Sequence, residues 1–479
     1  MRIAAPDRAR GARSPEWGHP RRYSLPTVSF SVLYPSRTPE GASYVRIAMI
    51  GGGYVGLVSG ACFAEFGIDV TLMEVDAAKL AALRDGRMPI YEPGLDKLVA
   101  ENVAAGRLAF TGELAEAVRG ADAVFVAVGT PTRRGDGHAD LSYVYAAAEQ
   151  VARAMTGYAV IVTKSTVPVG TGRHIAEIVR AVRPDLEFDV ASNPEFLREG
   201  SAIADFMRPD RVVIGTESER ARDVLRQLYR PLYLIEAPIV FTGIETAELT
   251  KYAANAFLAM KVTFINEMAD LCEKVGADVH DVARGIGLDG RIGRKFLHPG
   301  PGYGGSCFPK DTLALMRTAL DYGAPSRLVE ATVAVNEARK SGMARRIIDA
   351  CGGSVRGKTI AILGLTFKPE TDDMRDSPSI SILARLVGDG ATVRAFDPEG
   401  MEQARAVLPA GVAYCRDAVD AAAGADALVV VTEWNEFRAL SPVRLRDTMR
   451  GRVLVDLRNV YDPVAMRQAG FEYTSVGRP

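Results

Sequence analysis

Short apolar runs that alternate with helical stretches organise most of the chain. Residues 46–50 form such a run and enter a glycine turn, after which small and apolar residues follow at helical spacing as far as Phe66. A second apolar run, 69–73, ends on Glu74. Alternation of this kind is typical of a parallel sheet with helices on both faces. The pattern predicts an α/β domain that begins near residue 45.

Further apolar runs extend this sheet and then begin a second one. The runs 121–128 and 159–162 each lead into a polar loop, and ligands of open α/β sheets bind at the carboxyl ends of strands. The second sheet is predicted from the runs 358–364, 391–397, 425–432 and 453–456. It lacks a Gly-x-Gly-x-x-Gly turn, so we expect it to bind something other than a dinucleotide.

A long helical region separates the two predicted sheets. Its apolar stripe starts at Glu245 and continues past Leu271 with few helix breakers. By analogy at the level of the fold, a long helix that joins two nucleotide folds packs against its counterpart in a homodimer. We therefore predict an α/β protein with two Rossmann-like, doubly wound parallel sheets. The predicted divisions are 45–241 for the first sheet and its helices, 242–350 for the helical region, and 351–479 for the second sheet.

Residues 1–44 differ from the rest of the chain. They are rich in Arg, Pro and Ser and show no sustained periodicity, which is typical of a disordered extension. The pair Arg21–Arg22 is shared with twin-arginine signals, but prolines interrupt the weakly apolar stretch and no small-residue cleavage site follows. Because Val45 begins a sequence typical of the start of a nucleotide-binding enzyme, we hypothesise that natural translation starts there, from an alternative start codon.

Composition excludes several classes of protein. Of 479 residues, 48% are hydrophobic and 24% charged, with a net charge of −1, so no overall basic field favours nucleic acid as a partner. No apolar run reaches the roughly 18 residues of a membrane helix. Five scattered cysteines give neither a disulfide framework nor zinc-ligand spacing. We expect a cytoplasmic protein without a bound metal.

The glycine turn predicts a dinucleotide site. Gly51 would make the tight turn, Gly53 would let the backbone approach a pyrophosphate, and Gly56 would let helix and strand pack closely. The helix N-terminus would offer N–H groups and a positive dipole end to the phosphates. Glu74, at the end of the second strand, would bind the adenosine ribose and repel a 2′-phosphate, which favours NAD over NADP.

One cysteine lies in a loop that differs from the surroundings of the other four. Cys307 follows two glycines and a serine, and Lys310 and Asp311 come just after it. A nearby cation stabilises a thiolate, which is the nucleophilic form, so we predict a nucleophile here. The other cysteines lie in apolar contexts and are predicted to be structural. A cysteine nucleophile combined with NAD predicts a four-electron oxidation through a thiohemiacetal and a thioester, with two NAD per turnover.

The chain from about Val45 to its end resembles the UDP-glucose/GDP-mannose dehydrogenase family. The resemblance rests on the glycine turn together with the segments 129–132, 164–168, 193–200, 251–255, 304–311 and 367–369. It implies that 45–241 binds NAD, that 242–350 carries the catalytic cysteine and that 351–479 binds the UDP-sugar. The implied reaction is oxidation of a nucleotide sugar at C6, with UDP-glucose to UDP-glucuronate as the expected reaction. Two alternatives stay open, namely a GDP-mannose enzyme and a non-catalytic NAD-binding protein. The segment 304–311 favours UDP-glucose, whereas the N-acetylmannosamine branch usually has His where Ser306 stands.

The resemblance also implies catalytic roles. Cys307 would be the nucleophile, Lys251 would stabilise an oxyanion at C6, and Asn255 would act from the same helix face. Asp311 would position a water and pair with Lys251. Glu195 would be the base for thioester hydrolysis, with Thr130 holding a water nearby.

The resemblance implies binding roles for further residues. Cofactor contacts are expected from Gly51, Gly53, Tyr54, Val55, Gly56, Glu74, Lys79, Thr130, Thr166, Glu199, Lys310 and Arg375. UDP-sugar contacts are expected from Glu195, Phe196, Leu197, Lys251, Asn255, Arg291, Tyr303, Gly304, Phe367, Lys368 and Arg458. Among these, Arg291 would reach the neighbouring substrate across a dimer interface. Lys and Arg suit a pyrophosphate because they supply charge and donors.

Overall fold

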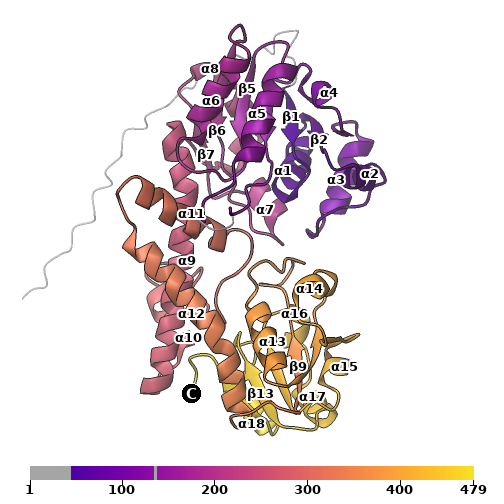
Figure 1. The fold of residues 1–479 in the computed structure, drawn as a ribbon, viewed down its shortest axis with the longest axis vertical. Helices are drawn as coiled ribbons and strands as arrows, with labels where there is room; N and C mark the ends of the chain where they lie inside the picture. Colours follow the sequence, from indigo (N-terminus) through magenta and orange to yellow (C-terminus); the bar gives the residue numbers. More distant parts are fainter. Residues whose placement is uncertain (1–44, 134–136) are drawn as a thin grey trace, which may run out of the picture. The chain divides into compact units, whose positions relative to one another are not determined.

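A computed structural model describes residues 45–133 and 137–479. The predicted extension at 1–44 lies outside the described residues. The remainder contains two sheets and a set of long helices (Figure 1). Its two sheets confirm the predicted fold class of two Rossmann-like units.

The N-terminal sheet contains eight strands in the described part of the chain, in the order β3-β2-β1-β4-β5-β6-β7-β8. They are β1 (Arg46–Ile50), β2 (Asp69–Met73), β3 (Leu108–Thr111), β4 (Ala123–Val126), β5 (Ala159–Thr163), β6 (Phe188–Ser192), β7 (Val212–Gly215) and β8 (Ile239–Thr242). The first six are parallel and follow the order expected of a doubly wound nucleotide fold. β7 joins β6 antiparallel through Ser192 and Gly215, so the sheet is not parallel throughout.

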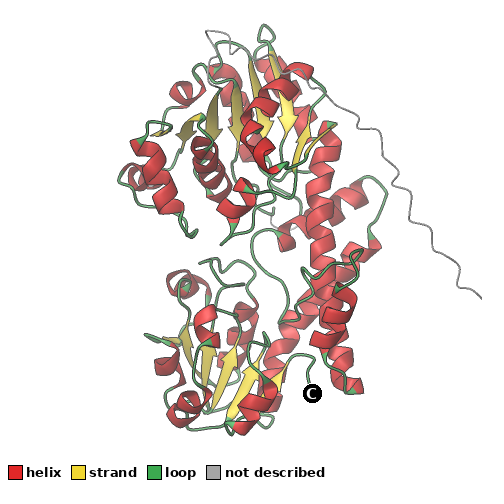
Figure 2. Ribbon diagram, turned by 180° about the vertical axis from the view of Figure 1, so that it is seen from behind, coloured by secondary structure: helices red, strands yellow, loops and turns green. Residues whose placement is uncertain are grey.

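Helices cover both faces of this sheet (Figure 2). They are α1 (Tyr54–Glu65), α2 (Ala77–Arg84), α3 (Leu95–Ala104), α4 (Leu114–Val118), α5 (Ser142–Ala154), α6 (Thr171–Val182), α7 (Ala202–Met207) and α8 (Glu219–Leu228), with the 3-10 helix η1 (Arg230–Ile235) after α8. Strands that are buried on both faces need continuous apolar runs. This is why the sequence showed such runs instead of strict alternation.

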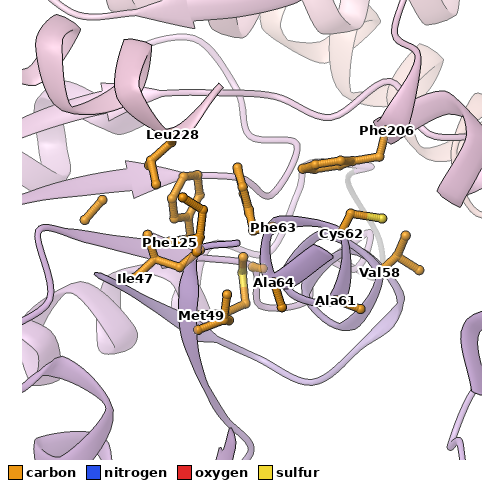
Figure 3. Packing of buried hydrophobic residues seen from close by; sticks show 14 of the residues in the cluster. Ile47, Met49, Val58, Ala61, Cys62, Phe63, Ala64, Phe125, Phe206 and Leu228 are labelled. Carbon is orange, nitrogen blue, oxygen red and sulfur yellow. The ribbon is translucent and has the colours of Figure 1, made fainter. Parts of the chain in front are cut away.

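Aromatic side chains fill the core on one face of the sheet (Figure 3). Phe63 of α1 lies with its ring centroid 5.3 Å from that of Phe125 of β4 and 4.9 Å from that of Phe206 of α7, the latter edge to face. Offset and edge-to-face geometries are the favoured arrangements of aromatic pairs. The cluster holds α1 against the face of the sheet. The N-terminus of α1, and with it the glycine turn, therefore lies at the carboxyl end of β1.

Four long helices follow the first sheet. They are α9 (Ile244–Val275), α10 (Val279–Gly287), α11 (Phe308–Asp321) and α12 (Arg327–Ala350). The longest, α9, ends at Gly276, which takes the left-handed conformation at φ 74°, as is common after a helix C-terminus. α9 packs against both α11 and α12. Residues from distant parts of the sequence therefore contact the same helix.

The C-terminal sheet has six parallel strands in the described part of the chain, in the order β11-β10-β9-β12-β13-β14. They are β9 (Thr359–Leu363), β10 (Thr392–Phe396), β11 (Ala413–Tyr414), β12 (Ala427–Val430), β13 (Val453–Asp456) and β14 (Glu472–Ser475). The accompanying helices are α13 (Pro378–Gly388), α14 (Met401–Val407), α15 (Ala418–Ala422), α16 (Asn435–Arg438), α17 (Pro442–Thr448) and α18 (Pro463–Gln468). The order repeats that of the first six strands of the N-terminal sheet.

Candidate active site

The three glycines of the turn after β1 have the geometry that their predicted roles require. Gly51 has φ 109°, and a Cβ there would lie 2.7 Å from the Ala127 carbonyl oxygen. A Cβ on Gly56 would lie 1.9 Å from the Gly51 oxygen, whereas one on Gly53 would meet no atom within 4 Å. Gly51 and Gly56 are therefore required by the packing, and Gly53 leaves open space where a pyrophosphate can approach.

Glu74 lies at the end of β2, as predicted. Its two carboxylate oxygens accept hydrogen bonds from the Gly52 N–H at 3.0 Å and the Asp76 N–H at 2.9 Å. The carboxylate is thereby fixed beside the glycine turn, where a ribose would bind. Lys79 lies on the exposed first turn of α2.

The loops after β4 and β5 are joined to one another. The Thr130 hydroxyl donates to the Thr166 carbonyl oxygen at 3.1 Å, and both threonines are buried. Because the two strands are parallel neighbours, their loops lie at the same edge of the sheet. The structure thus brings two predicted cofactor residues together.

A buried ion pair lies at the centre of the predicted catalytic set. Lys251 of α9 and Glu195, in the loop after β6, are joined at 3.1 Å between Nζ and Oε1. The two residues are only 2% and 5% exposed. Burial alone lowers the pKa of Lys251, but Glu195, Cys307 and Asp311 together raise it above its ordinary value. The carboxylates of Glu195 and Asp311 therefore favour the charged form of Lys251.

Asp311 has a different cation partner from the one predicted. Asn255, one turn after Lys251 on α9, donates to Asp311 Oδ2 at 2.6 Å, and Lys310 Nζ lies 2.7 Å from Oδ1. The predicted pairing of Asp311 with Lys251 is wrong in this structure. Lys251 forms its ion pair with Glu195, and the two Asp311 oxygens bind Lys310 and Asn255. Asp311 still acts on Lys251 electrostatically and raises its pKa.

Cys307 lies at the N-terminus of α11, where the helix dipole favours an anion. Its Sγ is 3.5 Å from the Ser306 hydroxyl oxygen. Burial raises the pKa of the thiol to about 11, and Lys251 is the cation that opposes this rise. The expected stabilising cation, Lys310, instead pairs with Asp311. The resting group is therefore a thiol at neutral pH.

The remaining cysteines, Cys62, Cys272, Cys351 and Cys415, are buried among apolar side chains. Burial raises the pKa of each thiol, to about 12 for Cys62. Buried thiols in apolar surroundings are inert. Their environments agree with the structural role predicted for them.

Glu199 joins three parts of the chain. Its carboxylate accepts from the Ser306 hydroxyl at 3.1 Å, from the Thr371 hydroxyl at 3.3 Å and from Arg375 Nη2 at 3.3 Å. Lys368 also donates to its backbone carbonyl oxygen. Burial and the nearby Asp373 raise the pKa of Glu199 to about 7. Arg375 thus meets the first domain at the Glu199 carboxylate, and Lys368 meets it at the Glu199 backbone carbonyl.

The cysteine loop fits closely against the C-terminal part. A Cβ on Gly304 would lie 2.3 Å from the Asp376 carbonyl oxygen, and one on Gly305 would lie 2.6 Å from the Phe367 ring. The Phe367 carbonyl accepts from Arg458 Nη2 at 2.8 Å. Tyr303 is buried in the same loop. This packing brings four predicted sugar-site residues together, namely Tyr303, Gly304, Phe367 and Arg458.

The C-terminal sheet differs from the N-terminal sheet at the equivalent turn. The amides of Leu365 and Thr366, just after β9, donate to Asp397 at 2.7 Å and 3.1 Å. The Trp434 indole N–H donates to the same carboxylate oxygen at 3.1 Å. In a dinucleotide fold such amides face a phosphate. Glu74 accepts from the Gly52 N–H at the N-terminal turn in a similar way, so an internal carboxylate is common to both turns. The two turns differ because Leu365 and Thr366 stand where the N-terminal turn has Gly52 and Gly53.

Two residues that were predicted to bind the substrate or the cofactor are exposed. Some buried polar residues near the site were not predicted. Arg291 is exposed and pairs with Asp289, and Lys79 is exposed on α2. The missed residues include Lys164, whose Nζ is buried and donates to Asn193 Oδ1 at 3.1 Å. Burial lowers its pKa to about 8. Its place in the segment 164–168 was the available signal.

Two absences hold for residues 45–133 and 137–479. No three His, Cys, Asp or Glu side chains there are grouped so that they could hold a metal ion. No helix there has the length and apolar character needed to cross a membrane.

This geometry defines a dinucleotide-binding dehydrogenase site with a cysteine beside a buried lysine. Family models for the NAD binding, central and UDP binding domains match residues 45–233, 245–338 and 361–463. The chain belongs to the UDP-glucose/GDP-mannose dehydrogenase family, and it is an NAD-dependent oxidoreductase. The resemblance deduced from the sequence is confirmed.

Individual relatives cover nearly the whole described chain. It is 62% identical to a UDP-glucose 6-dehydrogenase of Rhizobium meliloti over 437 residues, which are 91% of this chain and all of the relative. It is 47% identical to UDP-glucose 6-dehydrogenase TuaD of Bacillus subtilis, covering 91% and 93% of the two chains. A UDP-glucose dehydrogenase structure from Pyrobaculum islandicum matches with a TM-score of 0.85 at 40% identity, covering 92% and 100%.

The glycine turn yields a first prediction. Gly56→Ala should destabilise the protein by about 1–3 kcal/mol, because its Cβ would overlap the Gly51 oxygen. Gly53→Ala should change stability by less than about 0.5 kcal/mol but weaken NADH binding, since the methyl group would fill the approach to the pyrophosphate. Urea denaturation and NADH titration of both variants measure this difference. Equal stability of the two variants would contradict the assignment.

The raised pKa of the Cys307 thiol yields a second prediction. With a pKa of about 11, the rate of Cys307 alkylation by iodoacetamide should rise about tenfold per pH unit between pH 7 and 9, because only thiolate reacts. Lys251→Met should slow alkylation at each pH, since Lys251 lowers this pKa, and Lys251→Arg should retain much of the rate. An alkylation rate that has already reached its plateau at pH 7 would show that burial does not raise the pKa of the Cys307 thiol.

Proposed function

We propose that the chain oxidises UDP-glucose at C6 to UDP-glucuronate, with NAD as hydride acceptor in two successive oxidations and Cys307 as covalent nucleophile. The observation that carries the proposal is the cluster around the Lys251–Glu195 ion pair, in which Cys307, Asn255 and Asp311 meet. The 62% identical relative named UDP-glucose 6-dehydrogenase supports the choice of substrate.

In the first oxidation, the C6 hydroxyl becomes an aldehyde. The C6 hydride passes to the nicotinamide, and the hydroxyl proton passes to a water held by Asn255 and Asp311. Lys251 stabilises the negative charge that develops on the C6 oxygen, because a fixed cation in a buried site acts more strongly than in water. The ion pair with Glu195 keeps that cation charged in the interior.

In the second oxidation, the thiol of Cys307 adds to the aldehyde carbon and its proton ends on the C6 oxygen, which gives a thiohemiacetal. A second NAD, in place of the NADH already formed, would accept the remaining C6 hydride, and the hydroxyl proton would pass to the water held by Asn255 and Asp311, which gives a thioester. The thiol need not be ionised in the resting enzyme, since Lys251 can stabilise the charge that forms during addition.

Hydrolysis completes the reaction. Glu195 accepts a proton from a water, held in part by Thr130, that attacks the thioester carbon. The acid is released and Cys307 regains its proton. Glu195 follows Pro194 in the loop after β6, so its carboxylate is held by the same loop that carries the proposed sugar contacts Phe196 and Leu197.

The proposed binding sites lie at the carboxyl ends of the N-terminal strands and at the contact with the C-terminal loops. Lys368 and Arg458 suit a sugar-nucleotide pyrophosphate, and Arg375, through Glu199, adjoins the cofactor side. The remaining proposed contacts are those implied by the family resemblance. A GDP-mannose enzyme would share this chemistry. A non-catalytic NAD-binding protein would have no need to assemble all five catalytic side chains in one buried cluster.

Reaction stoichiometry tests the proposed function. UDP-glucose should yield two NADH for each acid formed, because the thioester route joins two oxidations. GDP-mannose and UDP-N-acetylmannosamine should be poor substrates. Formation of one NADH with release of an aldehyde would overturn the thioester route, and preference for GDP-mannose would overturn the substrate assignment.

Replacement of the nucleophile separates the two oxidations. Cys307→Ser should bind both ligands and stall after little NADH, because an ester hydrolyses far more slowly than a thioester. Single-turnover NADH formation measures this, with Cys272→Ser as a control that should turn over normally because Cys272 lies in a separate apolar core. Steady turnover by Cys307→Ser would contradict the assignment of Cys307 as the covalent nucleophile.

We also propose a homodimer that uses α9. Phe257, Phe264 and Leu271 lie seven residues apart on this helix and are 58%, 45% and 53% exposed, so they form one apolar stripe. Exposed contiguous apolar surface marks interaction sites. In such a dimer, the exposed Arg291 could reach the neighbouring substrate.

Light scattering measures the proposed assembly. Phe264→Glu should convert the dimer to a monomer, since a charge on the apolar stripe would be desolvated at the interface. Leu234→Glu, at an exposed apolar residue of η1, is the matched control and should remain a dimer. A wild-type monomer, or a Phe264→Glu dimer, would contradict this use of α9.

We place the protein in the cytoplasm. Its five cysteines are free in the structure, and the proposed mechanism needs Cys307 as a thiol. A reducing compartment keeps cysteines in that form. Residues 1–44 are outside the described residues and contribute nothing to this proposal.

A further inference from the structure

A buried carboxylate outside the proposed catalytic set holds two distant loops. Glu92 lies between α2 and α3 and is 6% exposed. Its carboxylate accepts from the Tyr54 hydroxyl, from the Gly200 N–H at 2.6 Å and from the Ala202 N–H at 2.8 Å. The three donors lie more than 30 residues from Glu92 in sequence, so its hydrogen bonds define a tertiary junction.

The donors to Glu92 are uncharged. A buried carboxylate is costly unless it is hydrogen-bonded, and three donors to one carboxylate offset this cost. Burial and the Glu92 charge raise the pKa of Tyr54 well above its ordinary value. The raised pKa favours the protonated hydroxyl of Tyr54, which is the form that donates to Glu92.

The junction connects the two sides of the site. Tyr54 is the first residue of α1 and directly follows Gly53 of the cofactor turn. Gly200 directly follows Glu199, which accepts from Ser306 next to Cys307. A continuous series of bonds thus runs from the glycine turn through Tyr54 and Glu92 to the loop that binds Ser306, the residue before Cys307.

We propose that Glu92 is a positioning residue that couples occupancy of the glycine turn to the placement of the Glu199–Gly200 segment, and through Ser306 to that of Cys307. A cofactor bound at the turn fixes the first turn of α1. Tyr54 then holds Glu92 in one orientation, and Glu92 holds the Gly200 and Ala202 amides. The cofactor thereby orders a loop on the substrate side.

Hydrogen exchange with saturating NADH tests this without a sugar substrate. In the wild type, NADH should slow exchange of the segment containing the Gly200 and Ala202 amides by at least about fivefold, the lower end of typical coupling between sites. In Tyr54→Phe, which loses only the hydroxyl, the slowing should fall below about twofold. Glu92→Gln should behave in the same way, since its amide group cannot accept all three bonds.

Tyr158→Phe is the matched control. Its hydroxyl also donates to a carboxylate of the same domain, Asp189, at 2.6 Å, but the pair lies outside the junction. It should keep the wild-type response. Equal slowing in Tyr54→Phe and wild type, or no slowing in wild type, would overturn the proposal.

A second readout uses the substrate and rests on the proposed function. UDP-glucose should tighten NADH binding to the wild type about fivefold, with no reaction because both ligands are reduced, and this factor should approach one in Tyr54→Phe. If the wild type fails to bind UDP-glucose, the substrate assignment fails while the exchange result still decides the role of Glu92. If coupling is the same in Tyr54→Phe, the proposal for Glu92 is wrong.

Discussion

The arrangement of the site depends on one interaction, the buried ion pair between Lys251 and Glu195. A lone ammonium in the interior would lose its charge, because desolvation disfavours the charged form. The carboxylate of Glu195, 3.1 Å away, keeps Lys251 charged. That cation lowers the pKa of Cys307 against the effect of burial. The pair therefore links three groups of the proposed mechanism, namely the proposed cation for oxidation, the proposed base for hydrolysis and the proposed nucleophile.

Each part of the fold supplies a component that the others lack. The N-terminal sheet provides the glycine turn and the Glu195 loop, α9 provides Lys251 and Asn255, and α11 provides Cys307 and Asp311. The C-terminal sheet has the same strand order, but its turn has Leu365 and Thr366 where the N-terminal turn has Gly52 and Gly53. A duplicated architecture therefore serves two different tasks, because function depends on the residues at the site and not on the fold.

The sequence predicted the parts that depend on local order. Each strand, the glycine turn and the loop of Cys307 are formed by contiguous residues. The local sequence pattern was therefore sufficient to predict them. Pairings between distant side chains were less accessible. Asp311 was expected to pair with Lys251 and instead binds Lys310 and Asn255. The packing of α11 against α9 places Asn255 beside Asp311. No spacing in the sequence shows this contact.

The effects of burial were also hidden from the sequence. Cys307 was expected to be stabilised as a thiolate by Lys310, whereas burial raises its pKa and Lys251 is the opposing cation. Glu92 showed no chemical signal in its own segment, whereas Lys164 lay in the segment 164–168 of the family resemblance but received no role of its own. Their importance comes from partners that lie far away in the chain, such as Gly200 for Glu92 and Tyr229 for Lys164.

Intact-protein mass spectrometry of Glu195→Gln, mixed with UDP-glucose and NAD, tests the covalent mechanism most directly. Its thiol is intact, so both hydride transfers should proceed. The thioester should then accumulate, because the base that activates water is missing. The account predicts a mass increase of one UDP-glucuronyl group, located on Cys307. A slow enzyme with no adduct would assign the base to another residue, and an adduct on a different side chain would contradict the role of Cys307.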